Sequence, residues 1–136
     1  MSSTRGIVAT GVYVPRQRLS GDEIEAAWGT SAPVSRAAVP AADEDTLTMA
    51  VAAARDALDD SDVAADDIGH VALATTTPPL DEGEFAPQAA AALGLPDDCR
   101  FETATQSTAA GADALRSAAT ADGPALAIVA DAPAGD

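Results

Sequence analysis

Residues 101–118 read "FETATQSTAAGADALRSA". A short strand-like run enters a turn of small and polar residues, Gln106, Ser107 and Thr108, and this turn opens a helix. A strand that passes through a tight turn into the N-terminus of a helix is typical of the approach to an active site in α/β proteins. This junction is therefore the first candidate functional site.

Strands and helices also alternate on both sides of this junction. We expect strands at 5–15, 70–76, 99–104 and 124–131, and helices at 20–29, 45–60, 84–95 and 108–123. Residues 30–44 hold Pro33 and Pro40 and are expected to form an extended connection. The alternation predicts an α/β fold around a mixed or parallel sheet, in a single domain over residues 1–136. No helix follows the last strand to cover the sheet, so we expect this domain to be incomplete.

Charge excludes several classes of partner. The chain has 22 acidic and seven basic residues, a net charge of −15, and all of the basic residues are arginines. Such a chain repels nucleic acid and anionic lipid. The acidic residues are dispersed rather than arranged in a calcium-binding loop, which favours a protein from a salt-loving organism over a calcium-binding or acidic-tail protein.

Single copies of cysteine and histidine limit the chemistry further. Cys99 cannot form a disulfide within the chain, and with only His70 beside it a transition-metal site is not expected. We expect Cys99 and Trp28 to be core residues. The sequence contains no apolar run long enough to cross a membrane and no signal peptide, so we expect a cytoplasmic protein.

Four stretches follow one another in the order of a known family: "GIVATGVYVPRQRLSGDEIEAAWG", "AVPAADEDTLTMAVAAARDAL", "DIGHVALATTTPP" and "TQSTAAGADAL". Together they resemble the N-terminal part of the archaeal-type 3-hydroxy-3-methylglutaryl-CoA synthases, members of the thiolase superfamily that serve the mevalonate pathway. The first two stretches match the family in residue identity, and the last two match it mainly in the spacing of their motif positions. The resemblance covers nearly all of this chain but only part of a family subunit.

This resemblance implies a partial thiolase-like fold. The family duplicates an α/β unit and places its active site between the halves; the first half supplies the catalytic cysteine, and the second half supplies a histidine. The chain matches the first half, so the resemblance implies a homo-oligomer or a companion chain that supplies the second half. It also implies an acyl-CoA or CoA ligand, with Arg16 and Arg18 as candidates to contact the CoA phosphates or, alternatively, to pair with nearby acidic residues. No tightly bound cofactor is expected.

The motifs place hydroxyl groups where the family has its catalytic groups. Thr108 falls at the position of the cysteine, with Ser107 just before it, and Thr76 falls at the position of the acid/base glutamate. A hydroxyl needs an adjacent base to become a nucleophile, and a threonine does not shuttle protons at neutral pH. We therefore expect Ser107 or Thr108 to cap a helix, while Glu82 and Glu84 are alternative carboxylates for the missing glutamate.

Three functions remain open, and whether the chain is itself an enzyme differs among them. The first is a synthase-like segment of the acyltransferase lineage that does not catalyse alone and acts in a larger or split assembly. The second is an acyltransferase that uses Ser107 or Thr108, completed by a partner's histidine. The third is a truncated gene remnant without independent function.

Overall fold

The computed structural model describes residues 4–78, 84–105 and 107–132 and divides the chain into two compact units. The smaller unit is Val14–Asp45, and the larger unit combines Met1–Tyr13 with Thr46–Asp136. The expectation of a single domain over residues 1–136 stays a prediction.

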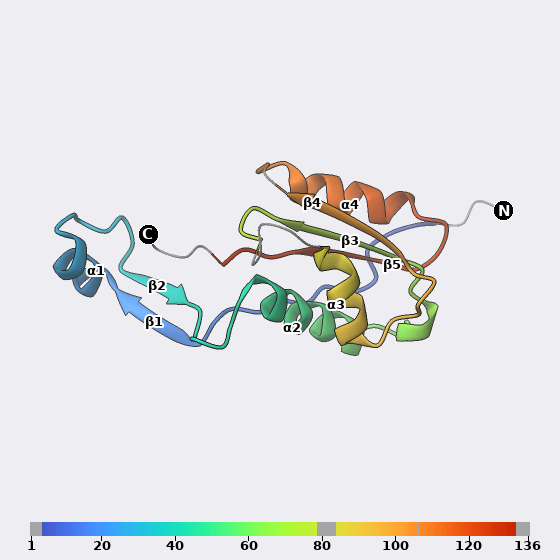
Figure 1. The fold of residues 1–136 in the computed structure, drawn as a ribbon, viewed down its shortest axis with the longest axis horizontal. Coiled ribbons are helices and arrows are strands. Elements are labelled where there is room, and N and C mark those ends of the chain that lie inside the picture. Colours follow the sequence, from blue (N-terminus) through green and yellow to red (C-terminus); the bar gives the residue numbers. More distant parts are fainter. Residues whose placement is uncertain (1–3, 79–83, 106, 133–136) are drawn as a thin grey trace. The chain divides into compact units, whose positions relative to one another are not determined.

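The smaller unit is a strand pair with one helix (Figure 1). Strands β1 (Gln17–Ser20) and β2 (Arg36–Val39) pair antiparallel, and helix α1 (Gly21–Trp28) lies between them in the chain. The helix begins with the capping box of Ser20 and Glu23 and ends at Gly29, whose φ of 70° is favourable for glycine. The sequence predicted this helix but not the two short strands.

None of the described residues of the smaller unit is buried. Trp28 is 65% exposed, so the expectation that it anchors a core is wrong. Two four-residue strands and one short helix offer too little surface to cover an indole ring within this unit.

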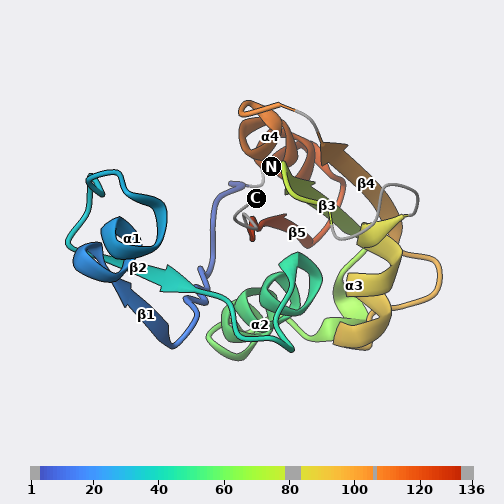
Figure 2. The ribbon, with the colours of Figure 1, turned by 60° about the vertical axis from the view of Figure 1, so that its left-hand side comes forward.

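The larger unit is a parallel sheet between helices. Its elements are α2 (Thr46–Asp59), the 3-10 helix η1 (Ala65–Asp67), β3 (His70–Thr75), α3 (Phe85–Leu93), β4 (Arg100–Thr105), α4 (Ala110–Thr120) and β5 (Ala125–Val129). The strand order is β4-β3-β5, and both pairings are parallel. Figure 2 shows α4 on one side of the sheet and α2 with α3 on the other. The α/β class predicted from the sequence is confirmed.

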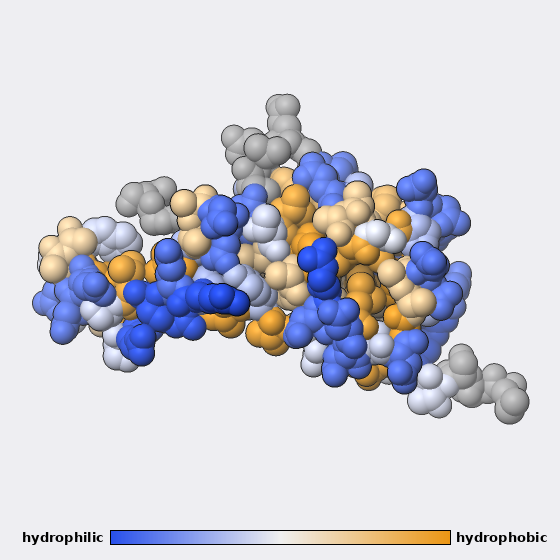
Figure 3. Space-filling model, turned by 90° about the horizontal axis from the view of Figure 1, so that it is seen from below, coloured by the Kyte–Doolittle hydropathy of each residue, from blue (hydrophilic) through white to orange (hydrophobic). Residues whose placement is uncertain are grey.

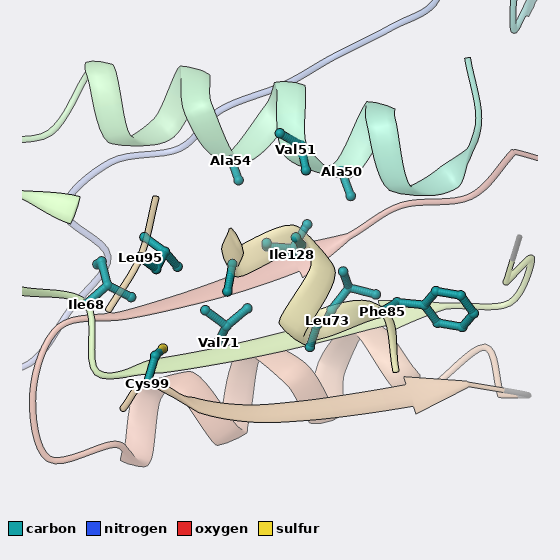
Figure 4. Packing of buried hydrophobic residues seen from close by; sticks show 13 residues of the cluster. Ala50, Val51, Ala54, Ile68, Val71, Leu73, Phe85, Leu95, Cys99 and Ile128 are labelled. Carbon is teal, nitrogen blue, oxygen red and sulfur yellow. The ribbon is translucent and has the colours of Figure 1, made fainter. Parts of the chain in front are cut away.

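The two faces of this sheet carry side chains of different size, and the central strand β3 shows why. Its side chains alternate, so Val71 and Leu73 point toward α2 and α3, while Ala72 and Ala74 face α4. Figure 4 shows the larger cluster, in which Phe85 of α3 and Ile128 of β5 join Val71 and Leu73. Most of the apolar burial therefore lies on the face covered by α2 and α3.

Small residues let α4 approach the opposite face closely. Ala110 and Ala114 of the helix pack on Ala72 and Ala74 of the sheet. A Cβ atom added to Gly111 would lie 3.3 Å from a methyl carbon of Val129, which is tighter than ordinary packing. Gly111 thus brings the N-terminal turn of α4 close to β5.

Residues 5–15 differ from expectation, because they form no strand in the structure. The run is extended and rich in β-branched residues, but a strand also requires a neighbour for its backbone, and none of the described strands pairs with it. Val8 and Val12 remain 77% and 73% exposed. The run has the residue types of a strand, but none of the strands in the described ranges supplies a hydrogen-bonding partner for it.

No helix in the part of the chain that the structure describes combines the length and apolar character needed to span a membrane.

Candidate functional site

A small cavity lies where the parallel strands end and α4 begins. It has a volume of about 220 Å³ and is lined by Ala74, Thr75, Thr76, Ser107, Thr108, Ala110, Gly111, Val129 and Asp131. The carboxyl ends of parallel strands are where α/β proteins usually bind ligands. The structure thus brings the three predicted positions, Thr76, Ser107 and Thr108, to one cavity.

Asp131, which follows β5, organises this cavity. Its Oδ1 atom accepts hydrogen bonds from the backbone N–H of Thr76 at 2.6 Å and from its hydroxyl at 3.0 Å. The hydroxyls of Thr75 and Thr77 donate to the same oxygen at 3.1 Å and 3.3 Å. One carboxylate oxygen therefore ties the turn after β3 to the end of β5.

These contacts also determine the charge of Asp131. Burial by itself raises the pKa of Asp131, but the hydrogen bonds from Thr76, Thr75 and Thr77 outweigh it and lower the pKa below its ordinary value. The group is therefore an ionised acceptor at neutral pH. It can hold the turn, but it has no proton to donate as a general acid.

The three consecutive threonines are held firmly in this arrangement. The hydroxyl of Thr46, at the start of α2, donates to the carbonyl oxygen of Thr77 at 2.6 Å, and the Thr77 backbone N–H donates to the Thr75 hydroxyl at 3.0 Å. The Thr77 hydroxyl also accepts from the backbone N–H of Ala132 at 2.8 Å. Thr76 thus sits in a turn whose two neighbouring threonines are hydrogen-bonded, with its own hydroxyl directed to Asp131.

The start of α4 differs in detail from the expected cap. Its N-cap residue is Ala109, and no side chain caps the helix there. The Ser107 hydroxyl instead accepts a hydrogen bond from the backbone N–H of Ala109 at 3.1 Å. Ala109 is the residue just before the first residue of the helix. Ser107 and Thr108 are both exposed at the cavity. Thr108, at the predicted cysteine position, is open to a ligand.

The reactive side chains lie at the other end of the sheet. His70 begins β3 and is paired in register with Arg100, the first residue of β4, which follows Cys99. Thr75 ends β3 five residues after His70, about 16 Å away at the usual rise of a strand. His70 and Cys99 therefore cannot act on Thr108. Cys99 is 5% exposed, as expected of a core residue, and burial together with the charge of Asp98 raises the pKa of its thiol.

His70 belongs to a separate polar cluster with Ser117 of α4 and Glu102 of β4. Its Nε2 atom lies 2.8 Å from the Ser117 hydroxyl oxygen, and that hydroxyl donates to Glu102 at 2.5 Å. The carboxylate thus contacts the serine rather than the far nitrogen of the imidazole, unlike the arrangement of a hydrolytic triad. The cluster fastens α4 to β3 and β4.

The remaining described candidates, Arg16, Arg18 and Glu84, are not among the residues that line the cavity. The Arg18 guanidinium donates to the carbonyl oxygens of Pro15 and Gln17, within the smaller unit, and Arg16 is exposed. Glu84 is exposed and precedes α3, whereas Glu82 and Gln106 lie outside the described residues. Among the described residues, no three His, Cys, Asp or Glu side chains gather closely enough to hold a metal ion.

Comparison with known proteins identifies the relatives of this chain. It is 34% identical over 122 residues to a hydroxymethylglutaryl-CoA synthase of Methanopyrus kandleri, a match covering 78% of this chain and 35% of that protein. The corresponding enzyme of Pyrococcus furiosus is 34% identical over 114 residues, 83% of this chain and 33% of that protein. The resemblance to archaeal hydroxymethylglutaryl-CoA synthases is confirmed.

Solved structures place the fold among condensing enzymes. The 3-oxoacyl-(acyl carrier protein) synthase III of Pseudomonas aeruginosa superposes with a TM-score of 0.79 and 25% identity, over 92% of this chain and 42% of that chain. No family model matches the sequence. The chain spans about a third of the length of the hydroxymethylglutaryl-CoA synthases that it matches. The thiolase-like fold is thus confirmed for this part of such a protein, while the assignments of Thr76 and Thr108 to catalytic positions stay predictions.

Sequence reasoning missed Asp131, whose Oδ1 atom accepts the four hydrogen bonds from Thr75, Thr76 and Thr77. The signal was present, because an aspartate directly follows the apolar run 124–130, and residues just after parallel strands meet at one edge of the sheet. The cluster of His70, Glu102 and Ser117 left no comparable signal, since its members are scattered over three elements.

Proposed function

We propose that this chain is a segment of a hydroxymethylglutaryl-CoA synthase-like assembly that supports acyl-CoA binding without forming an acyl-enzyme itself. The coarse assignment, kinship with these condensing enzymes, rests on the relatives and the fold. The finer assignment, a non-catalytic role in a larger or split assembly, rests on the cavity.

The observation that carries this proposal is the set of groups around the cavity. Acyl transfer from CoA requires an activated nucleophile and a nearby proton acceptor. The cavity offers hydroxyls and one carboxylate, and Asp131 is occupied by the turn after β3. The only histidine and the only cysteine of the chain lie at the opposite end of the sheet.

The second candidate is acyl transfer to Ser107 or Thr108 with a histidine brought by a partner chain. The exposure of both hydroxyls at the start of α4 favours it. It differs from the first candidate in one measurable respect, since it requires a covalent acyl group on the chain when the partner is present.

Incubation with acetyl-CoA followed by intact-protein mass spectrometry separates the two candidates. We expect no gain of an acetyl group by the chain alone or with proteins that copurify with it from its host. An acetyl group mapped to Ser107 or Thr108, and lost in the corresponding alanine variant, would overturn the non-catalytic assignment in favour of the second candidate.

Binding of CoA is tested separately, by titration calorimetry. We expect Arg16→Ala to weaken CoA binding by about tenfold, the size of one lost charge-assisted hydrogen bond. Arg36→Ala is the matched control, because Arg36 is an exposed arginine of β2 in the same unit. Equal losses in the two variants would point to general charge attraction, and no heat with the natural chain would count against CoA recognition.

A further inference from the structure

The cavity at the carboxyl ends of the strands is small. Its volume of about 220 Å³ lies below the roughly 300–1,000 Å³ of pockets that enclose a drug-sized ligand. Gly111 and Val129 pack tightly at one wall, because a Cβ atom on Gly111 would lie 3.3 Å from a methyl carbon of Val129. The cavity can therefore take the acyl end of a CoA thioester, but not its nucleotide.

Asp131 is the one acidic residue among the nine described residues that line this cavity. The hydrogen bonds from Thr75, Thr76 and Thr77 to its Oδ1 atom hold the carboxylate in place. They also lower the pKa of Asp131, so the group carries a full negative charge at neutral pH. The donors are uncharged hydroxyl and amide groups, which orient toward this charge without cancelling it.

No positive side chain offsets the charge of Asp131 inside the cavity. All seven arginines and the single histidine belong to the part of the chain that the structure describes, and none of them lines the cavity. The N-terminus of α4 does reach the cavity through Ala110 and Gly111, and a helix dipole is equivalent to about half a positive charge there. A carboxylate carries a whole negative charge, so the cavity stays negative.

The charge of the whole chain acts on every CoA thioester in the same way. Hydrophilic residues, in blue, are spread over the face shown in Figure 3, and the chain has 22 acidic residues against seven arginines. This excess repels the phosphates of any CoA thioester. The effect of Asp131 therefore appears as the difference in affinity between two thioesters that share CoA and differ in the charge of the acyl group.

We propose that Asp131 makes the cavity selective for uncharged acyl groups and excludes acyl groups that end in a carboxylate. In a cavity of this size a second carboxylate lies close to Asp131, where the protein screens the repulsion less than bulk water does. An uncharged acyl group contacts the hydroxyls of Ser107 and Thr108 and the small side chains of the wall without this penalty. The inference rests on the proposed acyl-CoA role and names the class of acyl group that the cavity takes.

A matched pair of ligands tests the proposal on the natural chain. Malonyl-CoA ends in a carboxylate, and malonamoyl-CoA, its terminal amide, has nearly the same shape without the charge. We expect titration calorimetry to give an affinity about tenfold higher for the amide, the size of the repulsion between two charges several ångströms apart near a protein surface. The ratio of the two affinities should shrink as the salt concentration rises, because salt screens this repulsion.

Two variants locate the source of the selectivity. Asp131→Asn removes the charge and keeps the shape of the side chain, so the two affinities should become equal. Asp122→Asn is the matched control, because it removes an exposed carboxylate from the turn between α4 and β5, at the amino end of the sheet. The control should keep the ratio of the natural chain. Circular dichroism checks that both variants are folded.

Three outcomes would overturn the proposal while the thioesters still bind and the acyl-CoA role stands. These are equal affinities of the natural chain for the two thioesters, a ratio that Asp131→Asn leaves unchanged, and an equal loss of the ratio in Asp122→Asn. The last outcome would assign the selectivity to the charge of the whole chain. If neither thioester nor CoA itself binds, the proposed acyl-CoA role fails, and the selectivity fails with it.

Discussion

At the amino ends of β3 and β4, His70 contacts Ser117 and Cys99 is buried in the core. At the carboxyl ends of the same sheet, hydroxyls and Asp131 surround a cavity that contains neither a thiol nor an imidazole. The end with the reactive residue types uses them to hold α4 and fill the core. The end with the cavity carries only hydroxyls and the ionised carboxylate of Asp131. The predicted catalytic positions and the reactive residue types therefore lie at opposite ends of the sheet.

The largest contrast between the two ends is expected in thiol reactivity. Thr108→Cys in a Cys99→Ser background should react with iodoacetamide at least about a hundredfold faster than Cys99 of the natural chain. Burial and the charge of Asp98 raise the pKa of the Cys99 thiol, whereas position 108 is exposed and lies near the N-terminus of α4. The rates are measured by mass spectrometry, and both proteins should react alike in denaturant. Similar rates in the folded proteins would remove the contrast.

The next effect concerns the contacts that hold the cavity together. Asp131→Ala should lower the free energy of unfolding by about 2 kcal/mol, because it removes a charged acceptor shared by three threonines. Chemical denaturation measures this loss. Asp131→Asn, which keeps the shape and one acceptor oxygen, should lose less. A loss in the alanine variant no larger than that of an ordinary surface substitution would show that Asp131 does not organise this edge.

The stabilisation by Asp131 should depend on pH in a defined direction. Its pKa is lowered in the folded protein, so its contribution is present above the unfolded value of about 3.9 and disappears as the pH falls through the folded pKa. The difference in unfolding free energy between the natural chain and Asp131→Asn should therefore be constant near neutrality and shrink below about pH 4. A difference that grows on acidification would contradict the lowered pKa.

The smallest change in the free energy of unfolding is expected at the amino ends of the sheet strands. Ser117→Ala removes the hydroxyl between His70 and Glu102 and should cost about 0.5–1 kcal/mol, because Glu102 is half exposed and water replaces part of the lost bond. Thr120→Ala is a useful control, since that hydroxyl donates to carbonyl oxygens of α4 itself, those of Arg116 and Ser117. A loss at Ser117 larger than that at Asp131 would reverse the ranking of the two ends.

The local sequence predicted the elements that carry their own signals. Helix α1 follows from Ser20, Glu23 and Gly29, and α3 ends at Gly94 as expected, because caps and turns depend on neighbouring residues. The strands β3, β4 and β5 were also predicted from their apolar runs, as was the convergence of Thr76, Ser107 and Thr108 from the family motifs. A strand was predicted at 5–15 and does not form among the described residues, and the pair β1–β2 was not predicted, because a strand exists only with its partner.

By itself, the sequence determined the α/β alternation, the ends of the helices, the acidic character and the kinship with archaeal hydroxymethylglutaryl-CoA synthases. Only the tertiary structure decided that Asp131 holds the turn beside the cavity, that His70 contacts Ser117, and that Gly11 lies against the backbone of α2. The physical reason is distance along the chain. Caps and periodicity act within a few residues, whereas these contacts join groups more than forty residues apart and exist only when the sheet and its helices have packed.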